Sequence, residues 1–455
     1  MNILYIHTHD SGKILSPYGY AVPTPNLQEF TKDALLFRNA YTVSPTCSPS
    51  RAALLTGTYP HTNGMLGLAH RGFQIKNYDW HLVRYLKKYG YHTVLCGIQH
   101  EAGSYLDHNK GARIIGYDED ISTDNSGINQ EDLVYWDFEN AKKAAQWIKE
   151  NGKRKKFFLS FGTFATHRPY PKEIDPLVDV RYVVPPYPTP DTPNNREDHA
   201  RYLTSVAWFD RSFGLIIRAL KEAKLYEDTI IIFTTDHGVA LPYSKCTLFD
   251  TGIGISLIIR VPGAKSNGEV CDALVSNIDV YPTLCDLLNL PKPEQLQGYS
   301  FVHLFDKYNS EHRKEVFAEI NFHTSYEPVR CIRTERYKYI RYMDPEYHGI
   351  NFSNIDNSPA KTFLLEHGLK NQTKPEEALY DLYFDPGERH NLANDLSYAS
   401  VLEYMRTRLL NWQLETSDPL LKGPIKIQPN WKVNKKTCIE PSSKDVNDYC
   451  NIPNN

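Results

Sequence analysis

The sequence predicts an α/β protein: a large, mostly parallel β-sheet sandwiched by helices, followed by a smaller C-terminal α+β domain built on an antiparallel sheet. Three observations predict this architecture. Short apolar runs alternate with helical patterns, polar residues recur where those runs end, and the pattern changes near Arg330. We therefore expect two domains, over residues 1–325 and 326–455.

Five short apolar runs predict buried parallel strands, because they are rich in β-branched and aromatic residues and do not alternate cleanly with polar ones. These runs are Ile3–His7, Thr93–Gly97, Phe157–Phe161, Thr229–Thr234 and Ile255–Val261. Between them, helical spacing of apolar residues predicts helices at Pro25–Leu36, Trp80–Lys88, Asn140–Glu150, His199–Ala223 and Val280–Leu288. This alternating order predicts a parallel sheet with helices on both faces.

The C-terminal part has a different pattern. Three runs predict an antiparallel meander, and an amphipathic helix follows them. The runs are Val329–Thr334, Lys338–Tyr342 and Leu379–Tyr383, and the helix is Val401–Glu415.

Composition indicates a globular protein with a large core, since 455 residues contain 41% hydrophobic residues and carry a net charge of −3. A near-neutral charge gives no reason to expect nucleic acid or a membrane surface as a partner. Because Met1 is followed at once by a predicted strand, and the eight cysteines are scattered, we expect a cytoplasmic protein. An exported protein given in its mature form is the alternative. The oligomeric state is not predicted.

Residues 47–57 form the most informative segment, Cys-Ser-Pro-Ser-Arg-Ala-Ala-Leu-Leu-Thr-Gly. Pro49 suits the first turn of a helix, which would place Cys47 just ahead of that helix, where unpaired N–H groups favour an anion. Arg51 lies four residues further on, so its guanidinium is expected to return to Cys47. The alternative is that Cys47 is an ordinary small residue and Arg51 a surface charge.

Polar residues follow four of the predicted strands. In open α/β sheets, ligands bind beyond the carboxyl ends of the strands. The residues at these ends are His9 and Asp10, His100, His167, and Asp236 and His237. Their positions predict one active site at this edge of the sheet.

The Cys47-x-Pro49-Ser50-Arg51 core and the later Leu-Thr-Gly resemble type I sulfatases of the alkaline phosphatase superfamily. Asp236-His237-Gly238 fits the same pattern, and the resemblance runs from Asn2 to the end of the chain. Among sulfatases, the sequence is most similar to the heparan N-sulfatase (N-sulfoglucosamine sulfohydrolase) subfamily, through segments such as 411–419.

The resemblance implies that a formylglycine-generating, sulfatase-maturing enzyme oxidises Cys47 to formylglycine. The hydrated aldehyde has two hydroxyls: one takes the sulfuryl group from an alcohol or amine, and collapse of the other expels sulfate. The implied substrate is a sulfated sugar, heparan-type N-sulfoglucosamine first, with no nucleic acid and no membrane as partner.

The resemblance also implies a divalent metal, calcium by family, held by Asp10, Asp236, His237 and His9. His9 departs from the family, which has a carboxylate at this position. Calcium prefers oxygen ligands, whereas imidazole suits manganese or zinc, so these metals are alternatives. His9 directed away from the metal is another alternative.

Three further residues match catalytic positions of the family. The resemblance makes His100 the base that takes a proton from the diol, and places His167 and Lys245 beside the sulfate and leaving group. A solvated loop lysine is the alternative for Lys245. The family has a lysine where this chain has Ile98. Either Gln99 gives the sulfate a neutral hydrogen bond instead, or a cation elsewhere in the chain supplies the positive charge.

Sugar contacts are the weakest prediction. The candidates are Gln99, Arg168, His323 and Arg330, with His70, Arg71 and Glu101 as further ones. Three other functions stay open: a phosphonate monoester or phosphodiester hydrolase of the same superfamily, an O-sulfatase acting on another glycan, and a glycan-binding pseudoenzyme.

Overall fold

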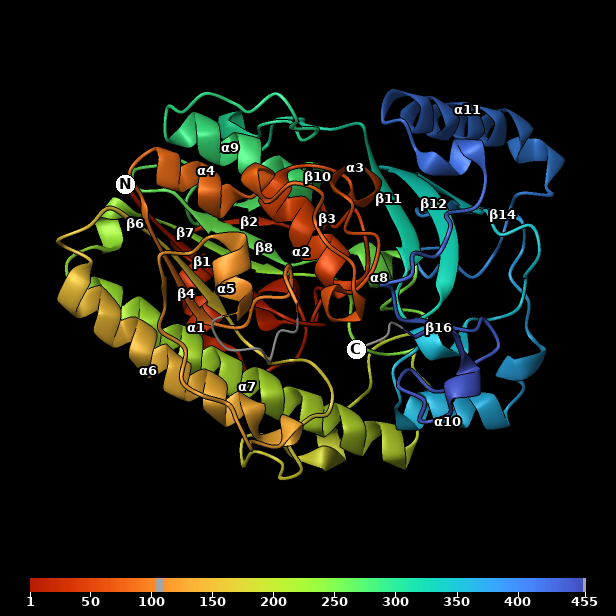
Figure 1. Cartoon of the computed structure of the whole chain (residues 1–455), viewed down its shortest axis with the longest axis horizontal. Helices are drawn as coiled ribbons and strands as arrows, with labels where there is room; N and C mark the ends of the chain where they lie inside the picture. Colours follow the sequence, from red (N-terminus) through yellow and green to blue (C-terminus); the bar gives the residue numbers. More distant parts are fainter. Residues whose placement is uncertain (104–109, 453–455) are drawn as a thin grey trace.

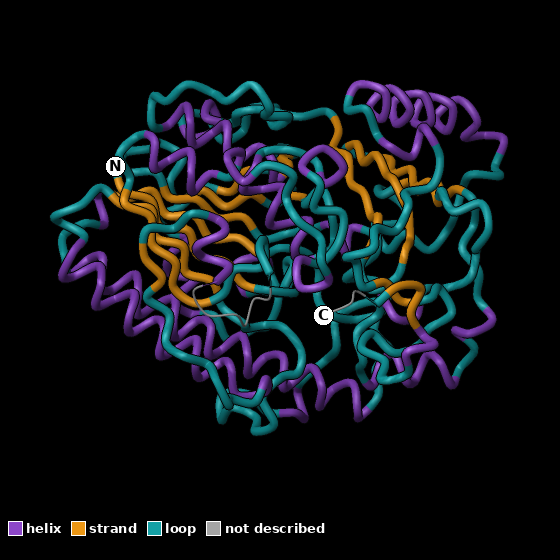
Figure 2. The backbone as a smooth tube through the Cα atoms, in the orientation of Figure 1, coloured by secondary structure: helices purple, strands orange, loops and turns teal. Residues whose placement is uncertain are grey.

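A computed structural model describes residues 1–103 and 110–452. Its centre is an eight-stranded sheet in the order β5-β4-β6-β1-β7-β8-β2-β9 (Figures 1 and 2). The strands are β1 (Asn2–Thr8), β2 (Leu35–Phe37), β4 (His92–Gly97), β5 (Glu119–Asp120), β6 (Phe157–Gly162), β7 (Thr229–Thr235), β8 (Leu257–Arg260) and β9 (Val270–Cys271). The predicted α/β class is confirmed.

The middle of the sheet is parallel. β1 pairs in parallel with β6 and β7, and β4 pairs in parallel with β5 and β6. β8 is antiparallel to both β7 and β2, so the prediction of a parallel strand over Ile255–Val261 was wrong. A parallel crossover needs a connection back along the sheet, usually a helix. Between β7 and β8 the only helix is the short α8 (Asp250–Ile253), and the chain re-enters the sheet at the edge where it left.

The predicted helix Pro25–Leu36 is divided between two elements. α1 (Pro25–Thr31) ends early, and Leu35–Phe37 forms β2. Leu35 and Phe37 pack on one face of the sheet and Leu36 on the other, which is the alternation of a strand. The apolar run was too short to separate from the preceding helical pattern.

Helices cover both faces of the large sheet (Figure 1). Leu4 and Ile6 of β1 pack with α1, α6 (Leu133–Asn151) and α7 (Pro193–Glu222), whereas Ile3 and Tyr5 face the opposite core. That opposite core is built by α2 (Cys47–Thr56), α4 (Leu82–Lys88) and α9 (Val280–Leu287). The sheet is therefore buried on both faces, which explains its continuous apolar strands.

A second, antiparallel sheet has the order β11-β12-β13-β14 (Figure 1, right). Its strands are β11 (Glu315–Phe322), β12 (Tyr326–Thr334), β13 (Tyr337–Tyr342) and β14 (Glu377–Asp381). The predicted meander is confirmed, and α11 (Ala399–Glu415) packs on the sheet through Met405, Leu409 and Trp412. The sheet begins at Glu315, before residue 326, while the division into residues 1–325 and 326–455 stays a prediction.

Shorter elements complete the described chain. They are β3 (Ala40–Tyr41), β10 (Val275–Ser276), β15 (Val433–Asn434), β16 (Tyr449–Asn451), α3 (Pro60–Asn63), α5 (Lys110–Ile115) and α10 (Pro359–Glu366). Within residues 1–103 and 110–452, every helix is too short or too polar to span a bilayer.

Candidate active site

Helix α2 carries Cys47 as its first residue, and Thr46 before it is extended. The predicted helix is confirmed, with Cys47 inside its first turn rather than just ahead of it. All ten residues of α2 are buried, and Ser50 Oγ donates to the backbone oxygen of Asp236 at 2.6 Å. This bond ties the start of the helix to the end of β7, so the Cys47 side chain lies at the carboxyl edge of the sheet.

Asp10 and Asp236 follow two adjacent parallel strands, β1 and β7. Asp236 Oδ1 accepts hydrogen bonds from the backbone N–H of Asp10 and of His237, both at 2.9 Å. Asp10 has a φ of 38°, in the left-handed region that is costly for a non-glycine residue. Strain of this kind persists where surrounding bonds hold it, and it is typical of functional sites.

His237 completes the group around Cys47. Its Nε2 lies 3.3 Å from Cys47 Sγ and 3.3 Å from Asp10 Oδ1. Its Nδ1 lies 3.0 Å from the backbone oxygen of Gly238, which can only accept. Nδ1 therefore donates to this oxygen, and Nε2 is the ring nitrogen that faces Cys47 and Asp10. A second partner of this kind is usual for histidines that bind metals.

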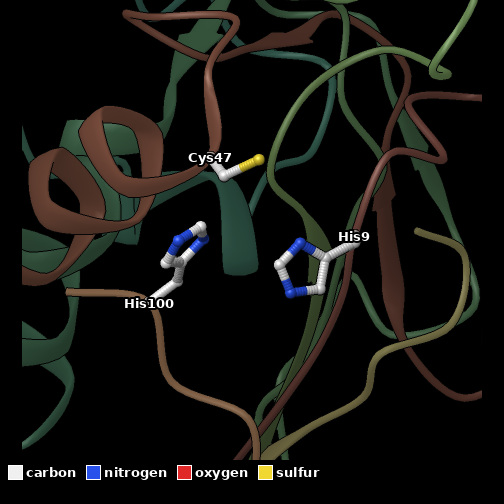
Figure 3. A group of neighbouring side chains, drawn as sticks. All are labelled: His9, Cys47 and His100. Atoms are coloured by element: carbon white, nitrogen blue, oxygen red, sulfur yellow. The ribbon is translucent and has the colours of Figure 1, made fainter. Parts of the chain in front are cut away.

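His9 faces the same group. His9 Nδ1 lies 3.4 Å from Asp236 Oδ2, so the alternative that the ring points away does not hold. Figure 3 shows His9 and His100 directed into one space with Cys47 at the start of α2. Burial and the charge of Arg51 lower the pKa of His9 to about 3, so its imidazole is neutral near pH 7.

Two cations lie against the two carboxylates. Arg51 Nη2 contacts Asp236 Oδ2 at 3.0 Å, and Arg51 also contacts His7 and the backbone oxygen of Thr8. The guanidinium was predicted to return to Cys47, but it contacts Asp236 and the end of β1 instead. Burial raises the pKa of Asp236, yet His237 and Arg51 outweigh it and hold that pKa well below the usual range.

Lys245 bridges two carboxylates, Asp10 and Asp356. Its Nζ lies 2.9 Å from Asp10 Oδ2 and 2.9 Å from Asp356 Oδ2. Burial lowers the pKa of Lys245, but the two carboxylates outweigh it and raise that pKa well above its ordinary value. The alternative of a solvated loop lysine is contradicted, because the side chain is 3% exposed.

Asp356 and His7 were missed in the sequence. Asp356 lies in a loop before α10, without a motif, and only the fold brings it to Lys245. His7 did carry a signal, because a histidine inside an apolar strand needs a polar partner. Burial and the charge of Arg51 lower the pKa of His7 well below its ordinary value.

His100 is buried beside His70. His100 Nε2 lies 3.0 Å from His70 Nδ1, and the two rings stack at 5.2 Å. The ring of His100 lies 6.0 Å from that of His9, which brings His100 to the Cys47 group as predicted from the strand order. His70 is the exposed member of the pair.

Gln99 and Ile98 do not supply what the family lysine supplies. The Gln99 amide closes its own loop: Oε1 accepts from the N–H of Glu101 and Ala102, and Nε2 donates to the Ala102 oxygen. These bonds use Oε1 and one N–H of the amide, and contact of Gln99 with sulfate stays a prediction. Ile98 packs in an apolar cluster with Leu133 and neighbouring aromatic residues.

His167 and Arg168 continue the site toward the surface. His167 Nδ1 lies 2.5 Å from the Arg168 backbone oxygen, and its ring meets His9 edge-on at 5.4 Å. Arg168 forms a two-bond ion pair with Asp198, at 2.7 and 2.6 Å. It lines a cleft of about 420 Å³, whose other lining residues are Gln130, Pro169, Tyr170, Asp198, Arg201, Asp356, Asn357, Pro441 and Ser442.

Arg330 is not a sugar contact. It is fully buried, and its five N–H donors meet five acceptors: two oxygens of Asp418, Asn321 Oδ1 and the backbone oxygens of Ile320 and Val329. An arginine has five donors in total, so none is left for a ligand. The prediction for Arg330 was wrong because the sequence does not show where its acceptors lie.

Three other candidate sugar contacts, His323, Arg71 and Glu101, lie in different surroundings. His323 is buried, and burial and the charge of Lys245 lower its pKa well below the ordinary value. Arg71 holds the C-terminal segment through the backbone oxygens of Lys432 and Pro441. Glu101 accepts from the backbone N–H of His100 and is buried.

The residues present fit a divalent cation. Ligand atoms of His9, Asp10, Cys47 and Asp236 all lie within 4.8 Å of one another. Together with His237 they provide two carboxylates and two imidazoles. This donor set matches zinc or manganese better than calcium, which prefers six to eight oxygens.

Comparison with known proteins covers nearly the whole chain. The family model described as Sulfatase matches residues 1–290, and the model described as N-sulphoglucosamine sulphohydrolase, C-terminal, matches residues 236–362. A human protein named N-sulphoglucosamine sulphohydrolase is 28% identical, over 93% of this chain and 92% of its own length.

Two solved structures share the fold. One is a complex with its substrate D-glucosamine-2-N,6-O-disulfate, at a TM-score of 0.69 and 18% identity, covering 93% of this chain and 99% of that one. The other is a phosphonate monoester hydrolase of Agrobacterium radiobacter, at a TM-score of 0.68 and 21% identity, covering 94% of this chain and 100% of that one.

Proposed function

Because the chain belongs to the sulfatase family, we propose that it hydrolyses sulfate from a sulfated carbohydrate, with heparan-type N-sulfoglucosamine as the leading substrate. The observation that carries the proposal is the position of Cys47, at the start of α2 and beside Asp10, Asp236 and His237. The choice of N-sulfoglucosamine is supported by the second family match and by the human relative.

Formylglycine formed from Cys47 would supply a hydrated aldehyde, with one hydroxyl to take sulfate and a second to release it. A divalent metal held by Asp10, Asp236, His237 and His9 would add positive charge at the sulfate oxygens. The residues of the chain provide the remaining functions. The first turn of α2 offers backbone N–H groups to an anion, and Lys245 adds a fixed positive charge.

We assign the proton transfers to His167 and His100. Since Nδ1 of His167 is bonded to the Arg168 oxygen, Nε2 is the atom at which the ring would first take up a proton and then pass it to the leaving oxygen or nitrogen. His100, whose ring nitrogen lies in one group with His9 and Cys47, is placed to accept a proton when sulfate is expelled. Arg51 acts through Asp236, whose carboxylate it fixes at 3.0 Å.

The cleft lined by Arg168 and Asp356 is the proposed sugar site. Asp356 joins the cleft to the Cys47 group, because it contacts Lys245, which contacts Asp10. The cleft offers carboxylates and guanidinium groups for sugar hydroxyls, together with the ring of Tyr170. Arg168 is stacked on that ring at 4.4 Å and paired with Asp198, so both are held in place before a sugar arrives.

The test is a substrate panel. Protein matured in its host is assayed against N-sulfoglucosamine, O-sulfated sugars and an aryl phosphodiester, next to Cys47→Ala. The matched control is Cys96→Ala, another buried cysteine, in β4 and outside the site. We expect N-sulfoglucosamine turnover that is lost in Cys47→Ala and kept in Cys96→Ala. Equal turnover by Cys47→Ala would refute the proposal.

A second candidate is a phosphonate monoester or phosphodiester hydrolase. It is favoured by the Asp236-His237 pair and by the shared fold with the Agrobacterium radiobacter enzyme. This reading replaces the first if the phosphodiester is turned over far faster than every sulfated sugar in the panel.

A further inference from the structure

Four potential ligand atoms enclose one position next to Cys47 in its unmodified form. His237 Nε2 lies 3.3 Å from Cys47 Sγ, 3.3 Å from Asp10 Oδ1 and 3.6 Å from Asp236 Oδ2. Cys47 Sγ lies 4.0 Å from Asp10 Oδ1. All of these side chains are buried.

These separations are those of a tetrahedral metal site. Bonds of about 2.0–2.3 Å to zinc give tetrahedral edges of about 3.3–3.8 Å between ligand atoms. Four of the six separations run from 3.3 to 4.0 Å, and ligand atoms of Asp10, Cys47 and Asp236 all lie within 4.8 Å of one another, so modest side-chain shifts bring all four atoms to bonding distance of one ion. The group of one sulfur, one imidazole and two carboxylates is a zinc-type donor set.

The orientation of each donor supports the same assignment. His237 Nδ1 donates to the Gly238 oxygen, which leaves Nε2 facing the group as a potential ligand atom. Lys245 occupies Oδ2 of Asp10, so Oδ1 is the oxygen turned toward Cys47. His9 contacts Asp236 Oδ2 at 3.4 Å and adds a second imidazole at the edge of the group.

The charges around the site favour a sulfur ligand for a divalent ion. Asp10, Asp236 and Asp356 carry three negative charges against the two positive charges of Lys245 and Arg51, so a divalent ion leaves one uncompensated positive charge in this buried site. A Cys47 thiolate removes that charge. Calcium gains little from sulfur and imidazole, since it prefers oxygen ligands.

We propose that the chain in which Cys47 is still a thiol binds one thiophilic divalent transition metal, such as zinc, through Cys47, Asp10, Asp236 and His237. On binding, the S–H bond of Cys47 breaks, a sulfur–metal bond forms and the proton passes to solvent. Conversion of Cys47 removes the sulfur ligand, so metal preference depends on the chemical state of this residue. Metal binding by the thiol form does not rest on the proposed sulfatase function, whereas the change in metal preference on conversion of Cys47 does.

The test is a cobalt titration of protein whose Cys47 is shown by mass spectrometry to be unmodified. Co²⁺ bound to a thiolate gives a sulfur-to-cobalt charge-transfer band in the near ultraviolet. We expect this band to saturate at one equivalent of Co²⁺ per chain, to disappear on adding Zn²⁺, and to persist in excess Ca²⁺.

Two variants test whether Cys47 is the sulfur ligand. Cys47→Ala should lose the band, and Cys96→Ala, which removes a buried cysteine elsewhere, should keep it; circular dichroism checks that both fold. A band that survives in Cys47→Ala, absence of the band in the folded native chain, or displacement of Co²⁺ by Ca²⁺ would overturn the proposal. The titration uses no substrate, so its failure leaves the sulfatase assay untouched, and the reverse also holds.

Discussion

Lys245 shows how single residues set the chemistry of this site. It lies at equal distance from Asp10, beside Cys47, and from Asp356, in the cleft. Two carboxylates on one ammonium keep it charged although it is buried, and they also fix its position. The link from the cleft to the Cys47 group therefore runs through one side chain.

Asp356→Asn tests this link. Losing a charged partner of a buried ammonium removes an interaction of about 1.5–3 kcal/mol, so we expect kcat for the sulfated sugar to fall roughly tenfold or more. Steady-state kinetics measure the effect, and Asp356→Glu, which keeps the charge, should recover part of kcat. An unchanged kcat in a folded Asp356→Asn protein would contradict the positioning role of Asp356.

At the scale of elements, the loops after the strands bring the candidate catalytic groups together. Helix α6 supports the loop that carries His167. Asp137 of α6 accepts hydrogen bonds from the backbone N–H of Phe164 at 2.8 Å and of Ala165 at 2.9 Å. These residues precede His167, so Asp137 holds the loop that carries it. Burial raises the pKa of Asp137 to about 7.

This raised pKa predicts a pH dependence of stability. Since the pKa of Asp137 is higher in the folded chain than in the unfolded one, the folded chain holds this proton more tightly. The resulting stabilisation is present below the unfolded pKa of about 3.9 and is lost as pH rises through about 7. Asp137→Asn cannot titrate, so the difference in Tm between the native chain and Asp137→Asn should shrink from pH 5 to pH 8. Thermal denaturation at several pH values measures it, and a constant difference would show that Asp137 does not titrate in this range.

Helix α11 gives the second prediction at this scale. Trp412 is buried, stacks on Phe317 at 5.0 Å, and meets Tyr59 edge-on at 5.0 Å, so it joins α11 to β11 and to the segment after α2. Trp412→Ala should lower the free energy of unfolding by about 3–5 kcal/mol, the usual loss for a buried tryptophan. Denaturant unfolding measures this change. A loss below about 1 kcal/mol would show that α11 contributes little to the fold.

For the whole molecule, the sequence predicted the architecture through local patterns. Strands β1, β4, β6 and β7 are buried on both faces, so their continuous apolar runs were readable, and the order of strands and helices predicted the parallel pairing. The direction of β8 was not readable, because it depends on the path of the loop between residues 236 and 256.

The candidate site likewise contains residues whose positions the sequence predicted and residues whose positions it did not. Residues directly after strands, such as Asp10, His100 and Asp236, meet because the strands are parallel neighbours, which sequence order indicates. The contact of Asp356 with Lys245 and that of Arg330 with Asp418 are set by distant packing, and no local pattern encodes them. The sequence therefore predicted which residues lie close to Cys47 better than it predicted which residues line the cleft.

The central claim is that catalysis depends on formylglycine at Cys47. The most direct measurement is the rate of sulfate release from N-sulfoglucosamine across preparations that differ in conversion of Cys47, with the converted fraction determined by mass spectrometry of the Cys47 peptide. We predict a rate proportional to that fraction, falling to zero for the unconverted thiol. A rate independent of conversion would contradict the claim.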